Sequence, residues 1–431
     1  MRLLFPILIV SLLFTTKLTA QADNESSTIG VIRVEGTIGP NTFTYFDRAL
    51  KESIDEGHDL FVMELDTPGG LLTSTQDIVK IMLNSSMPIV VFVSPEGANA
   101  GSAGTFITMA AHVAAMAPTT TIGAASPVSM GGAASPDTVM QKKLFNFTEN
   151  FIQNIAEKRD RNADWAITAV RDGKALTAEE ALEQNVVDLI AADREALIRE
   201  LNGMEVAGQI LNTEDAEVLF IEQSLAEKFF RIILRPEVIL ILTLISIYGI
   251  VGEITNPGTI VPGMAGLIAL ILLLYGVAAL PLNIAGFLLI GLSVILFILE
   301  AFTTSFGILT AGGAISFFLG SMMVFQDLPE SMQISWYWLV PATILTVVFF
   351  GLIATAGIKA QFSAHYTGME SWIGREALVT DKVGPDKGRV EIAGEYWNAR
   401  SATEIEENHH CRIESVKGLT LYVEPITTET E

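Results

Sequence analysis

Long apolar segments dominate the second half of the chain. Five are present, and they cover Val238–Val251, Met264–Leu280, Ile284–Phe302, Phe306–Phe325 and Tyr337–Ile358. Several approach the roughly 20 residues that an α-helix needs to cross the hydrocarbon core of a bilayer. The pattern predicts a helical transmembrane region at 236–358 with about five spans. The first segment is short, and the joints Asn256–Gly258 and Val261–Gly263 that follow it are tight turns. The alternative is therefore four spans with one re-entrant segment.

Residues 23–230 show a different pattern, in which short runs rich in β-branched residues alternate with helical periodicity. The predicted strands are Ile29–Val34, Leu60–Leu65, Ile89–Val93 and Val186–Ile190, and the predicted helices are 42–56, 73–84, 103–114 and 139–159. A capping box, Thr177 to Glu180, begins a further helix. The alternation predicts an α/β domain with a parallel-rich sheet covered by helices.

The last part of the chain, 368–427, is polar again and contains short runs with alternating apolar residues. The expected strands are Glu376–Thr380, Gly388–Ile392, Tyr396–Ser401, Cys411–Ser415 and Leu419–Val423. Five short strands separated by turn residues predict a small β-barrel.

The amino terminus has the features of a secretory signal. Arg2 precedes the apolar run Leu3–Phe14, and the small-residue pattern Ala20-Gln21-Ala22 follows. We therefore expect a signal peptide at 1–22, with a retained anchor as the alternative because Lys17 interrupts the approach to the cleavage site. The predicted location is the cell (inner) membrane, with 23–230 outside the cytoplasm. Five spans would place the carboxyl-terminal barrel in the cytoplasm, whereas four would not.

Composition excludes several kinds of partner. The 431 residues include 26 Lys+Arg and 49 Asp+Glu, so the net charge is −23 and nucleic acid is a poor partner. A single cysteine, Cys411, excludes a disulfide framework within one chain and a zinc site built from several cysteines. His409, His410 and Cys411 are adjacent in a predicted strand and should alternate between its faces, so we expect a strand start there rather than a metal site. No cofactor or metal is predicted, and protein contact is the better prediction for the barrel, because it lacks a basic face.

The segment Ile89–Pro118 carries candidate chemistry, because a buried strand runs into a loop of small residues and then into a helix. This arrangement places Ser102 at a helix amino terminus, where free N–H groups can stabilise an oxyanion formed on an attacked carbonyl. The alternative is that Ser102 only caps the helix. A second glycine-rich element, Asp66–Gly70, follows the strand Leu60–Leu65 and can supply another N–H donor, although alone it is more often just a turn.

A serine nucleophile needs a base, and neither histidine of this region is well placed. His112 follows Ser102 by ten residues on the predicted helix, about 15 Å at 1.5 Å per residue, and His58 precedes a strand at the opposite end from the serine loop. Lys142 and Lys143 are the remaining candidates, since a desolvated lysine can accept the serine proton.

Helical spacing separates the two lysines. Lys143 stands three residues after Met140 and four before Phe147, at the border of an apolar stripe, so we expect it to be partly buried. Lys142 should point to solvent. The alternative is that both lysines are solvated surface charges.

Several motifs together resemble those of the NfeD-type membrane serine peptidases, relatives of ClpP and of signal peptide peptidase A. The motifs are Leu65-Asp-Thr-Pro-Gly-Gly70, Gly97-Ala-Asn-Ala-Gly-Ser102-Ala-Gly-Thr105, Ile122-Gly-Ala-Ala-Ser-Pro127, Arg161-Asn-Ala-Asp-Trp165, Asn256-Pro-Gly258 and Gly394-Glu-Tyr-Trp397. The segment 408–411 departs from the family pattern, because a glycine-containing turn is expected there.

This resemblance implies a ClpP-like (crotonase-like) α/β domain at 23–230, a transmembrane bundle at 236–358 and an OB-fold NfeD-like domain at 368–427. It implies a Ser-Lys dyad of Ser102 and Lys143, with the backbone N–H groups of Gly70 and Ala103 as oxyanion donors. It also implies stomatin/SPFH-type membrane proteins as substrates or partners, and a homo-oligomer.

The leading hypothesis is a membrane-anchored serine endopeptidase that cleaves hydrophobic peptide segments. The alternative is a non-catalytic membrane scaffold for a stomatin-type partner. A third interpretation, chemistry on coenzyme A thioesters by a crotonase-like site, is disfavoured because the domain is predicted to be exported.

Overall fold

A computed structural model describes residues 27–127, 138–258, 260–303, 305–329, 332–362 and 369–426. The predicted signal peptide lies outside these described residues. The chain divides into two compact units. The first contains an α/β domain and most of the apolar helices, and the second contains the carboxyl-terminal barrel.

The α/β domain is built on a six-stranded sheet whose order is β11-β1-β2-β3-β5-β8. Every neighbouring pair in it is parallel. Its strands are β1 (Thr28–Glu35), β2 (Leu60–Asp66), β3 (Ile89–Val93), β5 (Val113–Met116), β8 (Leu189–Ile190) and β11 (Glu217–Phe220). A smaller sheet contains β4 (Asn99–Gly101), β6 (Thr121–Gly123) and β7 (Ala175–Thr177), and β9 (Glu205–Val206) pairs with β10 (Gln209–Ile210).

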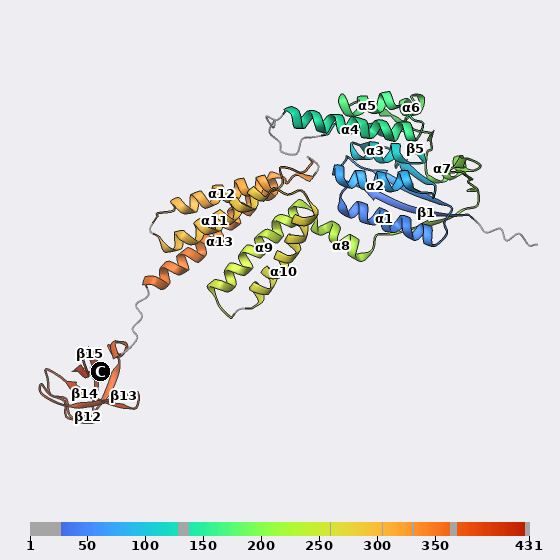
Figure 1. Cartoon of the computed structure of the whole chain (residues 1–431). Helices are drawn as coiled ribbons and strands as arrows, with labels where there is room; N and C mark the ends of the chain where they lie inside the picture. The colour runs from blue at the N-terminus through green and yellow to red at the C-terminus, as the bar shows by residue number, and fades with distance from the viewer. Residues whose placement is uncertain are drawn as a thin grey trace, which may run out of the picture. The chain divides into compact units, whose positions relative to one another are not determined.

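Helices cover both faces of the large sheet. The helices described in this part of the chain are α1 (Pro40–Asp55), α2 (Leu72–Asn84), α3 (Ala103–Ala110), α4 (Thr138–Lys158), α5 (Ala163–Arg171), α6 (Ala178–Glu183), α7 (Arg194–Leu201) and α8 (Leu225–Ile233), of which α8 packs on α1. Helices α1, α2 and α3 pack in sequence over one face (Figure 1). Alternate strand residues, such as Val62 and Met63, point into two separate apolar cores. Because both faces are buried, the strands are continuous apolar runs, as is usual for parallel sheets.

Most predicted elements of this domain are confirmed, but two differ. The helix predicted at 103–114 ends at Ala110, and Val113–Met116 forms strand β5. That segment is rich in alanine and favours a helix locally, but it pairs with β3 on one side and β8 on the other. Tertiary pairing therefore overrides local propensity. The strand predicted at Val186–Ile190 is also shorter, because only Leu189–Ile190 pairs in the sheet.

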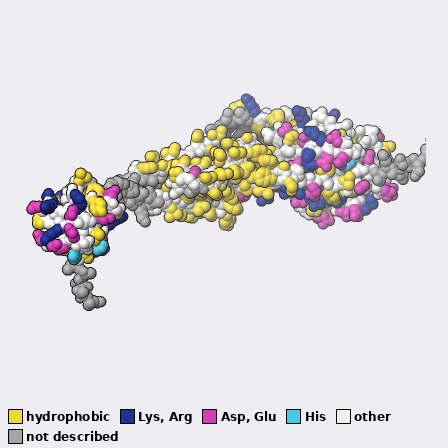
Figure 2. All heavy atoms as spheres, turned by 90° about the horizontal axis from the view of Figure 1, so that it is seen from below, with side chains coloured by type: hydrophobic (Ala, Val, Ile, Leu, Met, Phe, Trp, Pro, Cys, Tyr) yellow, Lys and Arg dark blue, Asp and Glu magenta, His cyan; other side chains and the backbone are white. Residues whose placement is uncertain are grey.

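Five apolar helices follow the α/β domain. They are α9 (Pro236–Thr255), α10 (Val261–Ala279), α11 (Ile284–Phe302), α12 (Ile308–Val324) and α13 (Trp336–Phe362). Within the described residues, three segments are long and apolar enough to cross a membrane, namely Pro236–Thr255, Val261–Ala279 and Trp336–Ile353. Figure 2 shows hydrophobic side chains exposed over these helices. The helical membrane region is confirmed, and the number of spans stays a prediction.

The carboxyl-terminal unit contains a closed five-stranded barrel in the order β12-β13-β14-β16-β15. Its strands are β12 (Glu376–Asp381), β13 (Arg389–Ile392), β14 (Glu395–Arg400), β15 (His410–Lys417) and β16 (Thr420–Pro425). Asn408 adopts a left-handed φ of 67° before β15, so it occupies the turn position for which a glycine was expected. The predicted small barrel is confirmed.

Small residues let the first two apolar helices approach closely, which is a common device in membrane bundles. A Cβ atom on Gly249 of α9 would lie 2.3 Å from the Pro262 carbonyl oxygen and 2.7 Å from the Gly266 Cα atom. Gly291 of α11, by contrast, faces open space. The α9–α10 contact therefore depends on the absence of a side chain at Gly249.

We predict that Gly249→Ala lowers the apparent melting temperature of the full chain in detergent, because overpacking against backbone costs roughly 1–3 kcal/mol. The matched substitution Gly291→Ala should leave it unchanged or raise it slightly, since alanine is favoured over glycine in helices by up to about 1 kcal/mol. Equal melting shifts for the two variants would contradict the close contact between α9 and α10.

Candidate active site

Ser102 lies between β4 and α3, on a backbone that is strained for a residue with a side chain. Its φ is 45° and its ψ is −105°, outside the usual regions for an L-amino acid. Its side chain makes no capping hydrogen bond, so the interpretation of Ser102 as a simple helix cap is wrong. The residue is half-buried, and its Oγ has no hydrogen-bond partner within the described part of the chain. Strain of this kind commonly marks a functional position.

Two backbone N–H groups near Ser102 are candidates for binding an oxyanion. Ala103 is the first residue of α3, where N–H groups have no partner inside the helix. Gly70 is bridged to Ile38 by two hydrogen bonds of its neighbours: the Ile38 N–H donates to the Gly69 carbonyl, and the Leu71 N–H donates to the Ile38 carbonyl. The Gly70 N–H itself therefore has no partner among the described residues. The resemblance to NfeD-type peptidases implied these same two residues.

Glycine is required where the Asp66–Gly70 loop meets the serine. A Cβ atom on Gly69, whose φ is 130°, would lie 2.8 Å from the Ser102 Cβ atom. One on Gly70 would lie 2.1 Å from the Ile38 carbonyl oxygen. The two glycines therefore allow the loop to touch both the serine and the end of β1.

Hydrogen bonds join this loop to the segment that precedes Ser102. The Thr67 N–H donates to the Asn99 carbonyl over 2.7 Å, and the Gly101 N–H donates to the Thr67 carbonyl over 2.9 Å. The Asn99 N–H donates to the Asp66 carboxylate over 3.0 Å. These bonds hold both candidate N–H donors in one frame with Ser102.

Lys143 lies in the second turn of α4, and its side chain is exposed. The predicted partial burial of Lys143 is therefore wrong, whereas the predicted exposure of Lys142 is confirmed. The reason is that, among the positions of α4 whose burial the structure describes (139 and 142–158), the first buried one is Thr148, so the core does not reach Lys143. Within the described residues, Lys143 forms no hydrogen bond with Ser102.

A cleft of about 530 Å³ lies beside Ser102. It is lined on the α/β side by Gly70, Leu71, Leu72, Thr73, Thr75, Ser102, Ala103, Phe106, Ala125, Pro127, Leu144 and Thr148. Its other wall consists of Ala278–Pro281, Gln326–Pro329 and Gln333, from the end of α10 and the segments that connect the apolar helices. Leu144 follows Lys143 directly, so the helix that carries the lysine borders the cleft. The sequence did not indicate this second wall, because its residues are remote along the chain.

Neither histidine of this domain can act on Ser102. His112 follows the end of α3, and its Nδ1 accepts a hydrogen bond from the Ile89 N–H over 3.2 Å. Burial, with Arg159 and Arg161 nearby, lowers the pKa of His112 to about 4. His58 is buried at the amino end of β2, where its Nδ1 lies 3.1 Å from the Ser53 Oγ. Ser102 follows the carboxyl ends of the strands, so the sequence-based exclusion of His58 holds.

No group of three or more potential metal ligands occurs among the residues that the structure describes. In the barrel, His410 is exposed whereas Cys411 is fully buried, so the two side chains lie on opposite faces of β15. The predicted alternation is confirmed for His410 and Cys411, whereas His409 is exposed and precedes the strand.

Comparison with known proteins identifies the family. Family models match three consecutive parts of the chain: NfeD1b, N-terminal domain, at 28–215; the NfeD integral membrane domain at 237–355; and the NfeD-like C-terminal, partner-binding domain at 369–425. The membrane-bound protease PH1510 of Pyrococcus horikoshii is 32% identical over 411 residues, which cover 91% of this chain and 92% of the relative. The chain belongs to the NfeD family.

Two further similarities concern parts of this NfeD chain. The membrane protein NfeD1b of Bacillus subtilis is 30% identical over 310 residues, covering 69% of this chain and 67% of the relative. A solved structure of 1510-N, a membrane protease specific for a stomatin homolog from Pyrococcus horikoshii, is 30% identical. The match covers 48% of this chain and 98% of that one, with a TM-score of 0.41.

The environment of His112 generates a pH prediction. Its pKa is lowered from 6.5 to about 4 in the folded domain, so the unfolded chain binds the proton more readily. Stability is therefore lost as the pH falls from 6.5 towards 4. Between about pH 7 and about pH 5 the loss should be on the order of 2 kcal/mol.

We predict that His112→Asn, which keeps an acceptor for the Ile89 N–H but cannot titrate, reduces this acid destabilisation of the full chain. The measurement is the shift in apparent melting temperature between the two pH values for each protein. Destabilisation by carboxylates is common to both and cancels in the comparison. Equal shifts would contradict the inferred burial of a neutral His112.

Proposed function

We propose that this NfeD protein is a membrane-bound serine peptidase in which Ser102 is the nucleophile. The observation that carries the proposal is the geometry of Ser102. A strained backbone holds its unpartnered Oγ beside the cleft, next to the free N–H groups of Gly70 and Ala103. The similarity to a relative called a membrane-bound protease supports it.

In the proposed reaction, the Ser102 Oγ attacks a peptide carbonyl while its proton passes to the Lys143 amine. The Gly70 and Ala103 N–H groups stabilise the oxyanion of the tetrahedral intermediate. As the C–N bond breaks, the proton is transferred to the leaving amine and an acyl-enzyme remains. A water molecule, deprotonated by the same lysine, then releases the acyl group and restores Ser102.

Substrate binding completes the environment of the lysine in this proposal. Lys143 is exposed without substrate, and a neutral amine is favoured by desolvation. Because Leu144 lines the cleft, a peptide lying there would cover the adjacent turn of α4 and remove water from it. The proposed base therefore becomes competent when the cleft is filled.

We further propose that the substrates are apolar segments of stomatin/SPFH-type membrane proteins. The cleft is lined by Leu71, Leu72, Phe106, Leu144 and other apolar side chains. The 1510-N relative is described as specific for a stomatin homolog, and the barrel matches a partner-binding domain. The homo-oligomer, the membrane orientation and the side of the barrel stay predictions.

A non-catalytic scaffold for the same kind of partner is the second candidate. The exposure of Lys143 and the absence of a hydrogen bond to Ser102 among the described residues favour it. The two candidates differ in one property, the reactivity of Ser102.

We predict that a fluorophosphonate probe labels the full chain in detergent, and that Ser102→Ala abolishes this labelling. Lys143→Ala should slow it by roughly 10²–10⁴-fold, the usual contribution of a general base. Lys142→Ala is the matched control, because this neighbouring lysine is also exposed, and it should label at the wild-type rate. An apolar peptide from a stomatin-type protein should slow labelling more than a polar peptide of equal length.

Each outcome of this labelling experiment has a defined meaning. Absence of label on the wild-type chain, with the fold intact, would favour the scaffold. Label that survives Ser102→Ala would place the nucleophile elsewhere. Labelling of Lys143→Ala at the wild-type rate would remove Lys143 from the mechanism but keep Ser102.

A second prediction tests the contact between the glycine loop and the serine. Gly69→Ala would place a Cβ atom 2.8 Å from the Ser102 Cβ atom and should displace the nucleophile. Because small misplacements of a reacting group are costly, labelling should fall on the order of 10²-fold. Gly97→Ala is the control, since Gly97 also has a positive φ, of 82°, but has open space around it.

Melting temperatures of both glycine variants separate lost reactivity from lost folding. Similar labelling rates for Gly69→Ala and Gly97→Ala, in proteins of similar stability, would show that the contact does not position Ser102.

A further inference from the structure

Helix α8 has a row of large apolar side chains that the protein does not cover. Leu225, Phe229 and Ile232 are 86%, 48% and 51% exposed. They stand at positions i, i+4 and i+7, so they form one stripe along the helix. Large apolar side chains in a continuous exposed row indicate a contact with something outside the chain.

This exposure does not come from a loosely held helix. Ser224 and Glu227 form a capping box at the start of α8. The Glu227 carboxylate also accepts a hydrogen bond over 2.8 Å from the Arg48 side chain of α1. The ring of Phe230 lies 4.6 Å from that of Tyr275 in α10. The opposite side of α8 is thus attached to both the α/β domain and an apolar helix, and the stripe is left outside.

The location of α8 identifies what covers the stripe. Helix α9 begins at Pro236, three residues after α8 ends, and it is long and apolar enough to span a bilayer. Tyr275 lies four residues before the end of α10, which runs back from α9 through a short turn. Because α9 and α10 cross the bilayer in opposite directions, the start of α9 and the end of α10 reach the same membrane surface. Helix α8 contacts both of these ends and is therefore held at that surface. Aromatic residues such as Tyr275 are enriched at this depth.

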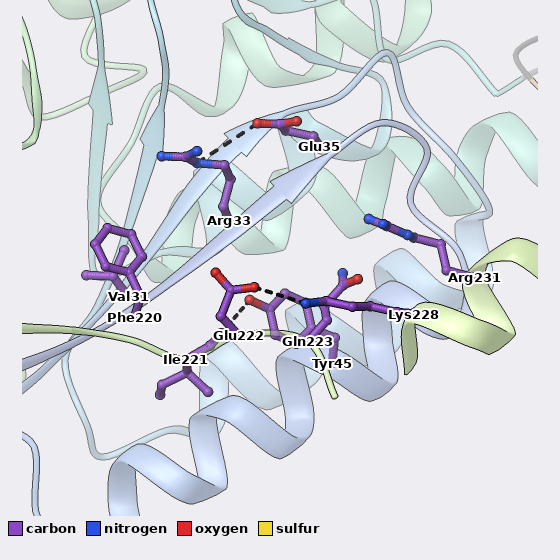
Figure 3. A pocket seen from close by; sticks show the side chains of 10 residues that line it. All are labelled: Val31, Arg33, Glu35, Tyr45, Phe220, Ile221, Glu222, Gln223, Lys228 and Arg231. Atoms are coloured by element: carbon purple, nitrogen blue, oxygen red, sulfur yellow. Dashed lines mark hydrogen bonds and ion pairs between the residues drawn. The ribbon is translucent and has the colours of Figure 1, made fainter. Parts of the chain in front are cut away.

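Basic side chains accompany the stripe. Lys228, Arg231 and Arg235 lie within eight residues of one another in a chain whose net charge is −23. Lys228 and Arg231 border a pocket of about 390 Å³ beside β1 (Figure 3). Lys228 is 3.4 Å from Glu222, and Arg231 forms no ion pair within the described residues. A helix with an apolar stripe flanked by cations is typical of the headgroup layer.

We propose that α8 lies in the bilayer interface, with Leu225, Phe229 and Ile232 among the upper acyl chains and the basic side chains near headgroup phosphates. Such helices insert roughly 5–10 Å below the surface. The partner is therefore a phospholipid surface, reached in continuity with the lipid-facing surface of α9 and α10. This contact holds the Ser102 cleft close to the membrane, and it does not depend on whether the protein cleaves peptides.

The test is the depth of single labelled positions in the full chain reconstituted in phosphatidylcholine–phosphatidylglycerol vesicles. Leu225→Cys, Phe229→Cys and Ile232→Cys are labelled separately with a nitrobenzoxadiazole fluorophore. Leu182→Cys is the matched control, because Leu182 of α6 is a similar apolar residue that is 41% exposed. The wild-type chain controls for background, since Cys411 is buried and burial raises its pKa to about 11.

Spin-labelled lipids with the quencher near the top of the acyl chain should reduce fluorescence at the three stripe positions several-fold more than at Leu182. The difference should persist when the protein is diluted into excess lipid. Equal quenching at the stripe and at Leu182 would overturn the proposal. Shielding of the stripe from aqueous iodide that disappears on dilution would also overturn it, because it would identify another protein molecule as the partner.

Discussion

The candidate site depends on how closely two backbone segments approach each other. Asp66–Gly70 begins at the last residue of β2, and Asn99–Gly104 comes after β3. Three hydrogen bonds join the two segments. Side chains are absent where the segments meet, because a Cβ atom on Gly69 or Gly70 would overlap Ser102 or Ile38. The surrounding bonds therefore hold Ser102 in a conformation that it would not adopt alone. This contact places the hydroxyl and two N–H donors in one rigid frame.

The parallel sheet explains why these segments can meet at all. The carboxyl ends of neighbouring parallel strands lie at the same edge, and the loops that follow them converge there. His58 precedes β2 and so lies at the other edge, where it bonds to Ser53. The apolar helices extend this arrangement, since the segments that connect them form the second wall of the cleft. Helix α8 joins the two parts, with Glu227 held by Arg48 and Phe230 against Tyr275.

Sequence patterns predicted the strands correctly where the whole strand is buried. The strands Leu60–Asp66 and Ile89–Val93 are buried on both faces, and their continuous apolar runs reveal this directly. The pattern failed at Val113–Met116, where an alanine-rich segment is a strand because it has partners on both sides. It also failed for the burial of Lys143. A helical stripe shows which face of α4 is apolar, but not how far along its length the core extends.

The sequence by itself determined the three-part architecture, the α/β alternation and the five barrel strands. These features follow from local signals, namely hydrophobic periodicity and turn residues. The small-residue loop at a helix start also singled out Ser102 as a candidate, and the resemblance to NfeD-type peptidases implied Gly70 and Ala103. Only the tertiary structure decided that Ser102 has a strained backbone and makes no capping hydrogen bond, that Lys143 is exposed, and that remote segments complete the cleft. The physical reason is that strain, exposure and enclosure arise from contacts between residues far apart in the chain. Local sequence patterns carry no record of those contacts.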